Sequence, residues 1–262
     1  MKKKILLFSS LAAALLFAVA FYACNKSDAA QSGQQFSEDA LFRGIMFNEG
    51  QVADLIPQLK SNQIKPEDVF DKKEDVKAVY DTRDKILASI KKADPAFLAY
   101  FKKEVTSGNT ERIKKAYKRG SERIYSSLLE VNNIHSRESR NAFNKQIQAS
   151  AKKYTIMNTD GTLNKAATES KLKSLVSENG LQPGKRITTL DDDDCIEVAA
   201  AGVVVIIAVV VFVVVEAAAV TDTYAWVTSG EASAFSGNVD NKLPLYLEEL
   251  IGEVAVNLKA AA

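Results

Sequence analysis

Few residues in this chain have types and spacing that could perform chemistry. The single histidine, His135, stands in the polar stretch NNIHSRES, where an imidazole is usually solvated or caps a helix. The four carboxylates of residues 191–194 could bind calcium, but they lack the interleaved glycine and the distal glutamate of a calcium loop. The chain has no phosphate-binding loop, dinucleotide fingerprint, HExxH pair or nucleophile elbow. We therefore expect neither an enzyme nor a metal or cofactor site.

The two cysteines bear on export and membrane attachment. Cys24 follows three lysines and an apolar stretch over residues 5–20, which is the arrangement of a secretory signal over residues 1–23. The ending FYAC is similar to a lipobox, so we expect lipidation at Cys24; plain cleavage and an uncleaved anchor are the alternatives. A lipid on Cys24 would leave Cys195 single, whereas a different cleavage would allow the two to form a disulfide. Residues 24–35 are polar enough for a flexible tether.

A second apolar stretch lies late in the chain. Residues 203–215 carry no polar side chain, and residues 198–220 are interrupted only by Glu216. A helix of that length spans about 34 Å, and a bilayer core is ~30 Å thick. The alternative is a buried strand, but the run is longer than ordinary strands and would aggregate in water. We predict a membrane-active helix marked by Val198, Val203, Val209, Phe212, Val215, Glu216 and Trp226, with Trp226 at the interface.

Apolar stripes at helical spacing run through residues 36–182. Ser37, followed by two acidic residues, predicts an N-cap, and Gly50 is expected to break that first helix. Pro57 should kink or end the next turn, and Pro66 should begin a helix. Further helices are predicted near residues 76–90, 97–105, 113–131, 137–155 and 163–180.

Charge is unevenly divided along the chain. Residues 24–189 carry a net charge of +8 and residues 190–262 a net charge of −10, although the whole chain is close to neutral at +1. The basic residues alternate with acidic ones and form no patch interleaved with aromatic residues, so nucleic acid is not an expected partner. We expect the basic part to hold the acidic part, mainly through helix packing, because surface ion pairs contribute little.

Two stretches resemble one family. Residues 36–59, FSEDALFRGIMFNEGQVADLIPQL, are similar to the N-terminal signature of the SdpC family, the sporulation-delaying antimicrobial peptide precursors. The main shared positions are Phe42, Arg43, Gly44 and Gly50. Residues 195–227 resemble the family's hydrophobic toxin segment, with Cys195 at its head, the sequence AAAVT, and Trp226 shortly after.

The resemblance implies an exported toxin precursor that is cut on both sides of its hydrophobic segment. The released peptide would attack membranes of neighbouring cells, and the resemblance also implies an immunity protein and a processing protease. The family's peptide can contain two nearby cysteines that form a small loop. Only Cys195 is present here, which removes any disulfide within the peptide.

Together these observations predict an all-α protein. The expected regions are a signal peptide (1–23), a tether (24–35), a helical pro-domain (36–182), a linker (183–194), a hydrophobic toxin-like segment (195–230) and a C-terminal tail with a short amphipathic helix (231–262). The expected partner is a lipid membrane, with self-association of the hydrophobic segment. The alternative function is a non-toxic, membrane-anchored lipoprotein whose helical domain binds a partner.

Overall fold

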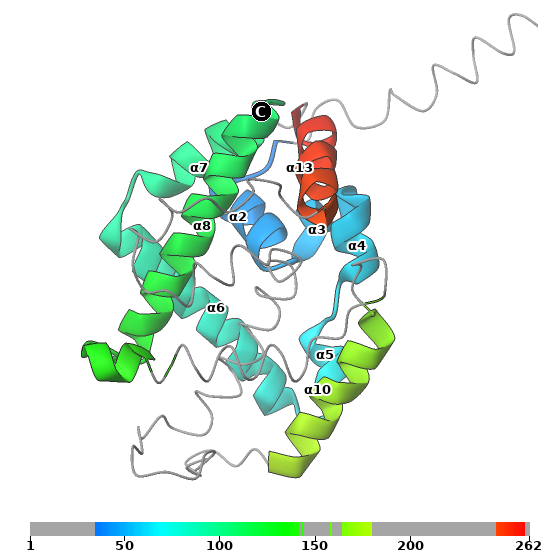
Figure 1. Cartoon of the computed structure of the whole chain (residues 1–262), viewed down its shortest axis with the longest axis vertical. Coiled ribbons are helices and arrows are strands. Elements are labelled where there is room, and N and C mark those ends of the chain that lie inside the picture. Colours follow the sequence, from blue (N-terminus) through cyan, green and yellow to red (C-terminus); the bar gives the residue numbers. More distant parts are fainter. Residues whose placement is uncertain (1–34, 142, 144–157, 159–163, 180–244, 260–262) are drawn as a thin grey trace, which may run out of the picture.

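The computed structural model describes residues 35–141, 143, 158, 164–179 and 245–259, and every element within these ranges is a helix (Figure 1). The predicted all-α class is therefore confirmed for the described residues. In chain order the elements are α2 (Glu38–Met46), α3 (Gly50–Leu55), α4 (Pro57–Asn62), α5 (Pro66–Val69), α6 (Lys73–Ala93), α7 (Phe97–Val105), α8 (Thr110–Val131), α10 (Lys165–Asn179) and α13 (Leu245–Asn257).

Helix α2 packs on α3, α7 and α8. It begins as predicted, because the Ser37 Oγ accepts a hydrogen bond from the Ala40 amide at 3.1 Å. Its side chain Phe42 is fully buried and meets three other rings edge-on, with centroids 5.7 Å from Phe47, 6.0 Å from Phe97 and 5.1 Å from Phe101. Such edge-to-face pairs add to the energy of burial, so Phe42 joins α2 to α7.

The long helices α6 and α8 pack against each other, and α7 packs on both α2 and α8 (Figure 1). Asn109 caps the start of α8: its Oδ1 accepts a hydrogen bond from the Arg112 backbone amide at 3.0 Å. The preceding Gly108 has a φ of 68°, a left-handed conformation that glycine adopts without strain. The sequence Ser-Gly-Asn, residues 107–109, thus forms the turn between α7 and α8.

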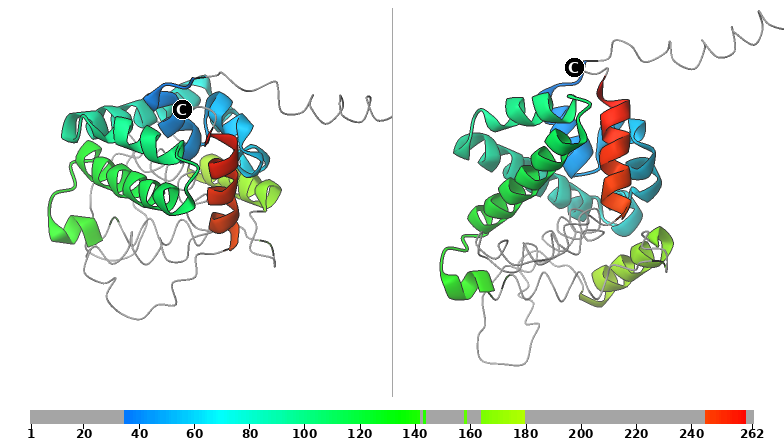
Figure 2. Two further views of the ribbon diagram at one scale, coloured as in Figure 1. Left: turned by 90° about the horizontal axis from the view of Figure 1, so that it is seen from above. Right: turned by 45° about the horizontal axis from the view of Figure 1, so that its top comes forward.

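The last helix, α13, packs on α8 and α4 although it follows them by more than a hundred residues (Figure 2). One face of α13 is buried in the same core as α2 and α8, while Glu248, Glu249 and Val256 are exposed. The buried side chains recur at helical spacing: Leu247, Leu250, Ile251 and Val254, followed by Leu258 just after the helix. The tail therefore contributes directly to the folded body.

One expectation about the first helix is wrong. Gly50 does not break it: α2 already ends at Met46, and Gly50 is the first residue of α3, with a φ of 70°. The chain turns at Asn48, which has a φ of 53°. Asparagine tolerates this left-handed conformation better than most residues, so the reversal begins two residues before the glycine.

The proline expectations are confirmed. Pro57 separates α3 from α4 and occupies the first turn of α4, and Pro66 begins the short helix α5.

The expected helix at 137–155 is described only in its first part, where residues 137–141 are helical. Within the ranges that the structure describes, none of the helices combines the length and apolar character needed to cross a bilayer. The predicted membrane-active run lies outside those ranges.

Candidate functional site

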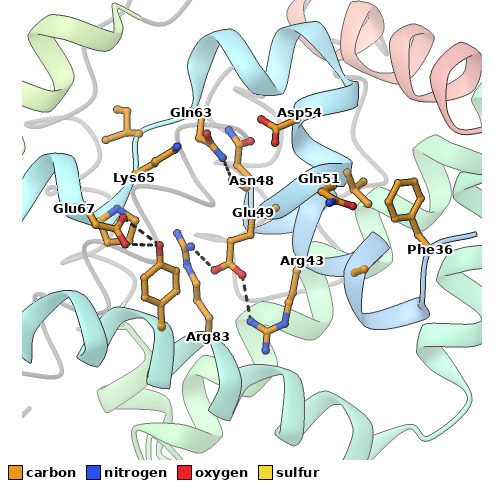
Figure 3. A pocket seen from close by; sticks show the side chains of 16 residues that line it. Phe36, Arg43, Asn48, Glu49, Gln51, Asp54, Gln63, Lys65, Glu67 and Arg83 are labelled. Carbon is orange, nitrogen blue, oxygen red and sulfur yellow. Dashed lines mark hydrogen bonds and ion pairs between the residues drawn. The ribbon is translucent and has the colours of Figure 1, made fainter. Parts of the chain in front are cut away.

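A connected group of charged side chains lies where α2, the loop after it, and α6 meet (Figure 3). Arg83 of α6 is 2% exposed and pairs with Glu49 of the loop. Glu49 also accepts from Arg43 of α2, with Oε2 at 3.2 Å from Nη1. Arg43 makes a second ion pair with Asp84 of α6. One carboxylate thus bridges two guanidinium groups, and the resulting network ties three segments together.

The surroundings of this network raise the pKa of Arg43. Burial alone would lower the pKa of Arg43, but the hydrogen bonds and charges of Asp84 and Glu49 outweigh it and raise that pKa above its ordinary value. Two carboxylates and two guanidinium groups balance each other in formal charge. A buried charge is tolerated only when it is paired, and this network meets that condition for Arg83.

Tyr80, one turn before Asp84 in α6, extends the group. Its hydroxyl donates to the carboxylate of Glu67, at 3.0 Å from Oε1. Burial, reinforced by this hydrogen bond, raises the pKa of Tyr80 to about 12. The guanidinium of Arg83 lies over two rings, 5.8 Å from the centroid of Phe47 and 5.7 Å from that of Tyr80. These cation–π contacts stabilise the buried charge further.

The loop that carries Glu49 is itself held by amide side chains. Asn48 Nδ2 donates to the Leu59 carbonyl at 2.9 Å, and Gln63 Nε2 donates to the Asn48 carbonyl at 2.7 Å. These contacts join the loop to α4, at Leu59, and to Gln63, the residue that follows α4. They fix the left-handed turn at Asn48 and thereby the position of the bridging carboxylate.

A pocket of about 780 Å³ opens beside this network. Its lining includes Arg43, Glu49, Lys65, Glu67 and Arg83, so charges of both signs are present (Figure 3). Glu49 neutralises the guanidinium of Arg83 and part of that of Arg43, and the pocket contains neither a cysteine nor a histidine. This arrangement can hold polar groups of either charge.

A second hollow, of about 610 Å³, lies between α7 and α8. Its cations are also engaged: Arg123 Nη2 lies 2.6 Å from Asp94 Oδ2, and the guanidinium of Arg119 lies 4.9 Å from the ring centroid of Tyr100. In the described parts of the chain, no group of three or more histidine, cysteine, aspartate or glutamate side chains is placed to hold a metal ion.

The four motif residues of the resemblance occupy connected positions. Phe42 fills the core, Arg43 joins the ion-pair network, and Gly50 provides the positive φ at the start of α3. Gly44 allows α2 and α3 to touch: a Cβ at this position would lie 2.4 Å from the Cβ of Val52, closer than real Cβ contacts. The geometry gives the motif a part in folding, through the α2–α3 packing.

Sequence reasoning missed Glu49, Tyr80 and Arg83 as members of one site. A signal for Arg83 was present, because it falls on the apolar face of α6 between Val79 and Ile86, where a charge needs a partner. The identity of that partner depends on a contact 34 residues away in the chain.

His135 is exposed beyond the end of α8. Other predicted residues lie outside the described residues: Cys24, Val198, Val203, Val209, Phe212, Val215, Glu216 and Trp226, together with Cys195.

Comparison with known proteins settles the family. The model of the sporulation delaying protein family toxin matches residues 33–259. The chain belongs to this toxin family. No curated protein and no solved structure matches the chain.

Membership of the toxin family connects the two ends of the described structure. The matched residues begin before α2 and reach past α13, so one family unit contains the helical body, the hydrophobic run and the last helix. The resemblance found in residues 36–59 and 195–227 is confirmed at the level of the family. In general terms, family membership supports a toxin or antimicrobial precursor.

Proposed function

We propose that this toxin-family chain is an exported precursor from which a hydrophobic peptide, within residues 195–230, is released to insert into target-cell membranes. The observation that carries the proposal is the run of residues 203–215 without a single polar side chain, inside a chain that belongs to a toxin family. The proposed activity is physical and requires no catalytic group and no cofactor.

The physical chemistry of a bilayer supports a helical form for the released peptide. In hydrocarbon every backbone N–H and C=O must be satisfied within the segment, which a single span achieves only as a helix. Glu216 and Asp222 would be costly at the centre of the bilayer, so they should mark a turn or line a polar lumen. Trp226 is suited to the interface, where its ring and its N–H meet different surroundings.

The helical body has a separate role in this proposal. A contiguous apolar segment of this length is rarely tolerated in a soluble protein. In this proposal the precursor therefore needs a folded part that keeps the segment from aggregating during export. The body contributes its own buried core and its own charge network. It is therefore suited to act as a carrier, and the membrane activity should lie in the released peptide alone.

A synthetic peptide of residues 195–236 tests the activity. It should become helical in lipid vesicles and dissipate an ion gradient across them. Val209→Asp should weaken insertion by roughly 2.5–3.5 kcal/mol, because a carboxylate would lie near the centre of the bilayer. Ser233→Asp is the matched control: it adds the same charge in the polar part, and insertion should change little. Circular dichroism and a potential-sensitive dye measure the two effects.

The result that contradicts the proposal is specific. If the unmodified peptide binds vesicles but leaves ion gradients and cell viability intact at every dose, the toxin activity fails. The alternative, a membrane-anchored lipoprotein with a partner-binding helical domain, would then explain the apolar run as an anchor. Mass spectrometry of culture medium separates the two functions independently, since only a toxin precursor releases a short fragment.

Export and attachment are a further part of the proposal. The N-terminal lysines, the apolar segment and Cys24 support a precursor held at the membrane by a lipid. The relation to the toxin family adds to the proposal a protease that processes the precursor and an immunity protein that counters the peptide. Metabolic labelling with a fatty acid should mark the unmodified chain, and the Cys24→Ala variant should remain unlabelled. Absence of label from the unmodified chain would remove the lipid anchor from the proposal.

A further inference from the structure

Helix α13 is joined to the rest of the body by side-chain packing across a large gap in sequence. Helix α10 ends at Asn179 and α13 begins at Leu245, and the segment between them contains the proposed toxin peptide. In the fold, α13 packs on α8 and α4, both of which precede that segment (Figure 2). The toxin segment is therefore internal to the chain, and the helices that precede it in sequence pack on the helix that follows it.

The contact is mainly apolar. Leu250 is fully buried, Val254 is 1% exposed, and Leu247, Ile251 and Leu258 are each less than 5% exposed. All five belong to the same core cluster as the aromatic side chains of α2 and α7. Apolar burial of this kind depends on removal of surface from water and requires no covalent link between the two sides.

One hydrogen bond and one close side-chain contact also connect this segment to the body. Glu253 Oε2 accepts a hydrogen bond from the backbone N–H of Gln58, in the first turn of α4, at 2.8 Å. Amides in the first turn of a helix have no carbonyl to bind within that helix, and a carboxylate is favoured at a helix N-terminus. Beyond α13, the side chain of Lys259 lies against Gly108, so close that a Cβ there would be 2.9 Å from Lys259 Cδ.

We propose that α13 stays bound to the helical body after the toxin segment is cut out, so that the processed precursor is a complex of two chains. The surface formed by α4 and α8 is then the docking site, and its occupant is the C-terminal remnant of the same chain. This inference depends on the proposed function only for the excision itself. In this role α13 continues to cover the apolar core of the body after the covalent connection is lost.

The test uses the full chain with two engineered protease sites, inserted after Gly184 and after Gly237, and an affinity tag after residue 262. After digestion, the tag is pulled down under native conditions. The unmodified chain should recover the body together with the C-terminal remnant in equal amounts. The complex should survive high salt, because its contact is apolar rather than ionic.

Two variants with the same substitution separate specific docking from general effects of charge. Leu250→Asp places a carboxylate in the buried face and should lower recovery of the body at least tenfold. Val256→Asp makes the same change on the same helix at a side chain that is 78% exposed, and recovery should stay within twofold of the unmodified chain. Glu253→Gln keeps the size of the side chain, removes its charge, and should speed dissociation severalfold.

Several outcomes would overturn the inference. Separation of the unmodified remnant from a body that remains helical would show that the covalent link is required, and so would unfolding of the body on digestion. Equal losses for Leu250→Asp and Val256→Asp would exclude docking through the buried face. If Leu250→Asp fails to fold before digestion, the unmodified chain and Val256→Asp still decide the result. None of these readouts involves a membrane, so failure of the toxin activity is a separate finding.

Discussion

Replacing Gly44 with alanine should destabilise the body, because α2 and α3 touch at this residue. The added Cβ would lie 2.4 Å from Val52 Cβ, 2.7 Å from Val52 Cγ1 and 3.2 Å from the Ala53 amide nitrogen. The nearest of these atoms is attached directly to the α3 backbone, so relief requires movement of one helix against the other. Rotation of a side chain would not be enough.

The expected size follows from two opposing effects. Overpacking a close contact costs about 1–3 kcal/mol, and a 2.4 Å approach favours the upper part of that range. Alanine in a helix interior gains about 0.5–1 kcal/mol over glycine. The net loss for Gly44→Ala should be about 2 kcal/mol. For a folded unit of roughly 150 residues this lowers the melting temperature by about 4–8 °C.

Two other glycines provide graded controls. A Cβ added to Gly252 of α13 would meet no atom of another described segment within 4 Å, so Gly252→Ala should stabilise the chain by about 0.5–1 kcal/mol. Gly120 of α8 is intermediate, since the nearest neighbour of its added Cβ would be the flexible Met46 side chain at 3.0 Å. Urea unfolding followed by far-ultraviolet circular dichroism measures all three. The reasoning is refuted if Gly44→Ala is as stable as the unmodified chain while Gly252→Ala behaves as expected.

Two further predictions concern the charge network. Arg83→Met should lower the free energy of unfolding by about 1.5–3 kcal/mol, because it removes a buried charged hydrogen bond. Lys77→Met, which removes an exposed ion pair, should lower it by at most ~0.5 kcal/mol. Equal losses would contradict a stabilising role for the buried pair of Arg83 and Glu49. The pKa of Tyr80 is raised to about 12 in the folded chain, above its ordinary value of ~10, so the protonated hydroxyl favours the folded state. This contribution to stability is complete below pH ~10 and should be lost as the pH rises from there towards 12. Ultraviolet titration should show one tyrosine ionising near pH 12 that is missing in Tyr80→Phe; an unchanged titration would exclude this assignment.

Local signals in the sequence predicted the helices well because those signals act over a few residues. Ser37 and the two carboxylates after it specify the start of α2. Pro57 and Pro66 begin α4 and α5 because each lacks the N–H that a helix interior needs. In the helix predicted near residues 113–131, the side chains Ile113, Tyr117, Ile124 and Leu128 recur at helical spacing and lie in the core.

The connections between elements were harder to predict. Glycine permits a positive φ, which is why the sequence predicts a break at Gly50. Asn48 adopts a positive φ first, with its side chain bound to the Leu59 carbonyl of α4 and its backbone carbonyl bound to Gln63, just after α4. The role of Glu49 depends on Arg43 and Arg83, which the fold brings together from different helices. No local pattern encodes such a bridge.

The charge division along the sequence predicted an interaction between the basic and acidic parts, with packing as its main source. Helix α13, in the acidic part, does pack on α8 and α4. Its contact is apolar and includes one charged hydrogen bond, in which the Gln58 amide donates to Glu253. The acidic side chains Glu248 and Glu249 are exposed, which is consistent with the small contribution expected from surface charge.

The residues that define the family motif and the residues proposed to attack membranes have different physical roles. Phe42, Arg43, Gly44 and Gly50 act through packing, a charge network and backbone conformation inside the folded body. The proposed peptide depends instead on the absence of polar groups over residues 203–215. A change in the motif should therefore alter how much precursor accumulates, because destabilised chains are removed by proteases. It should leave the potency of a given amount of released peptide unchanged, since that peptide contains none of the motif residues.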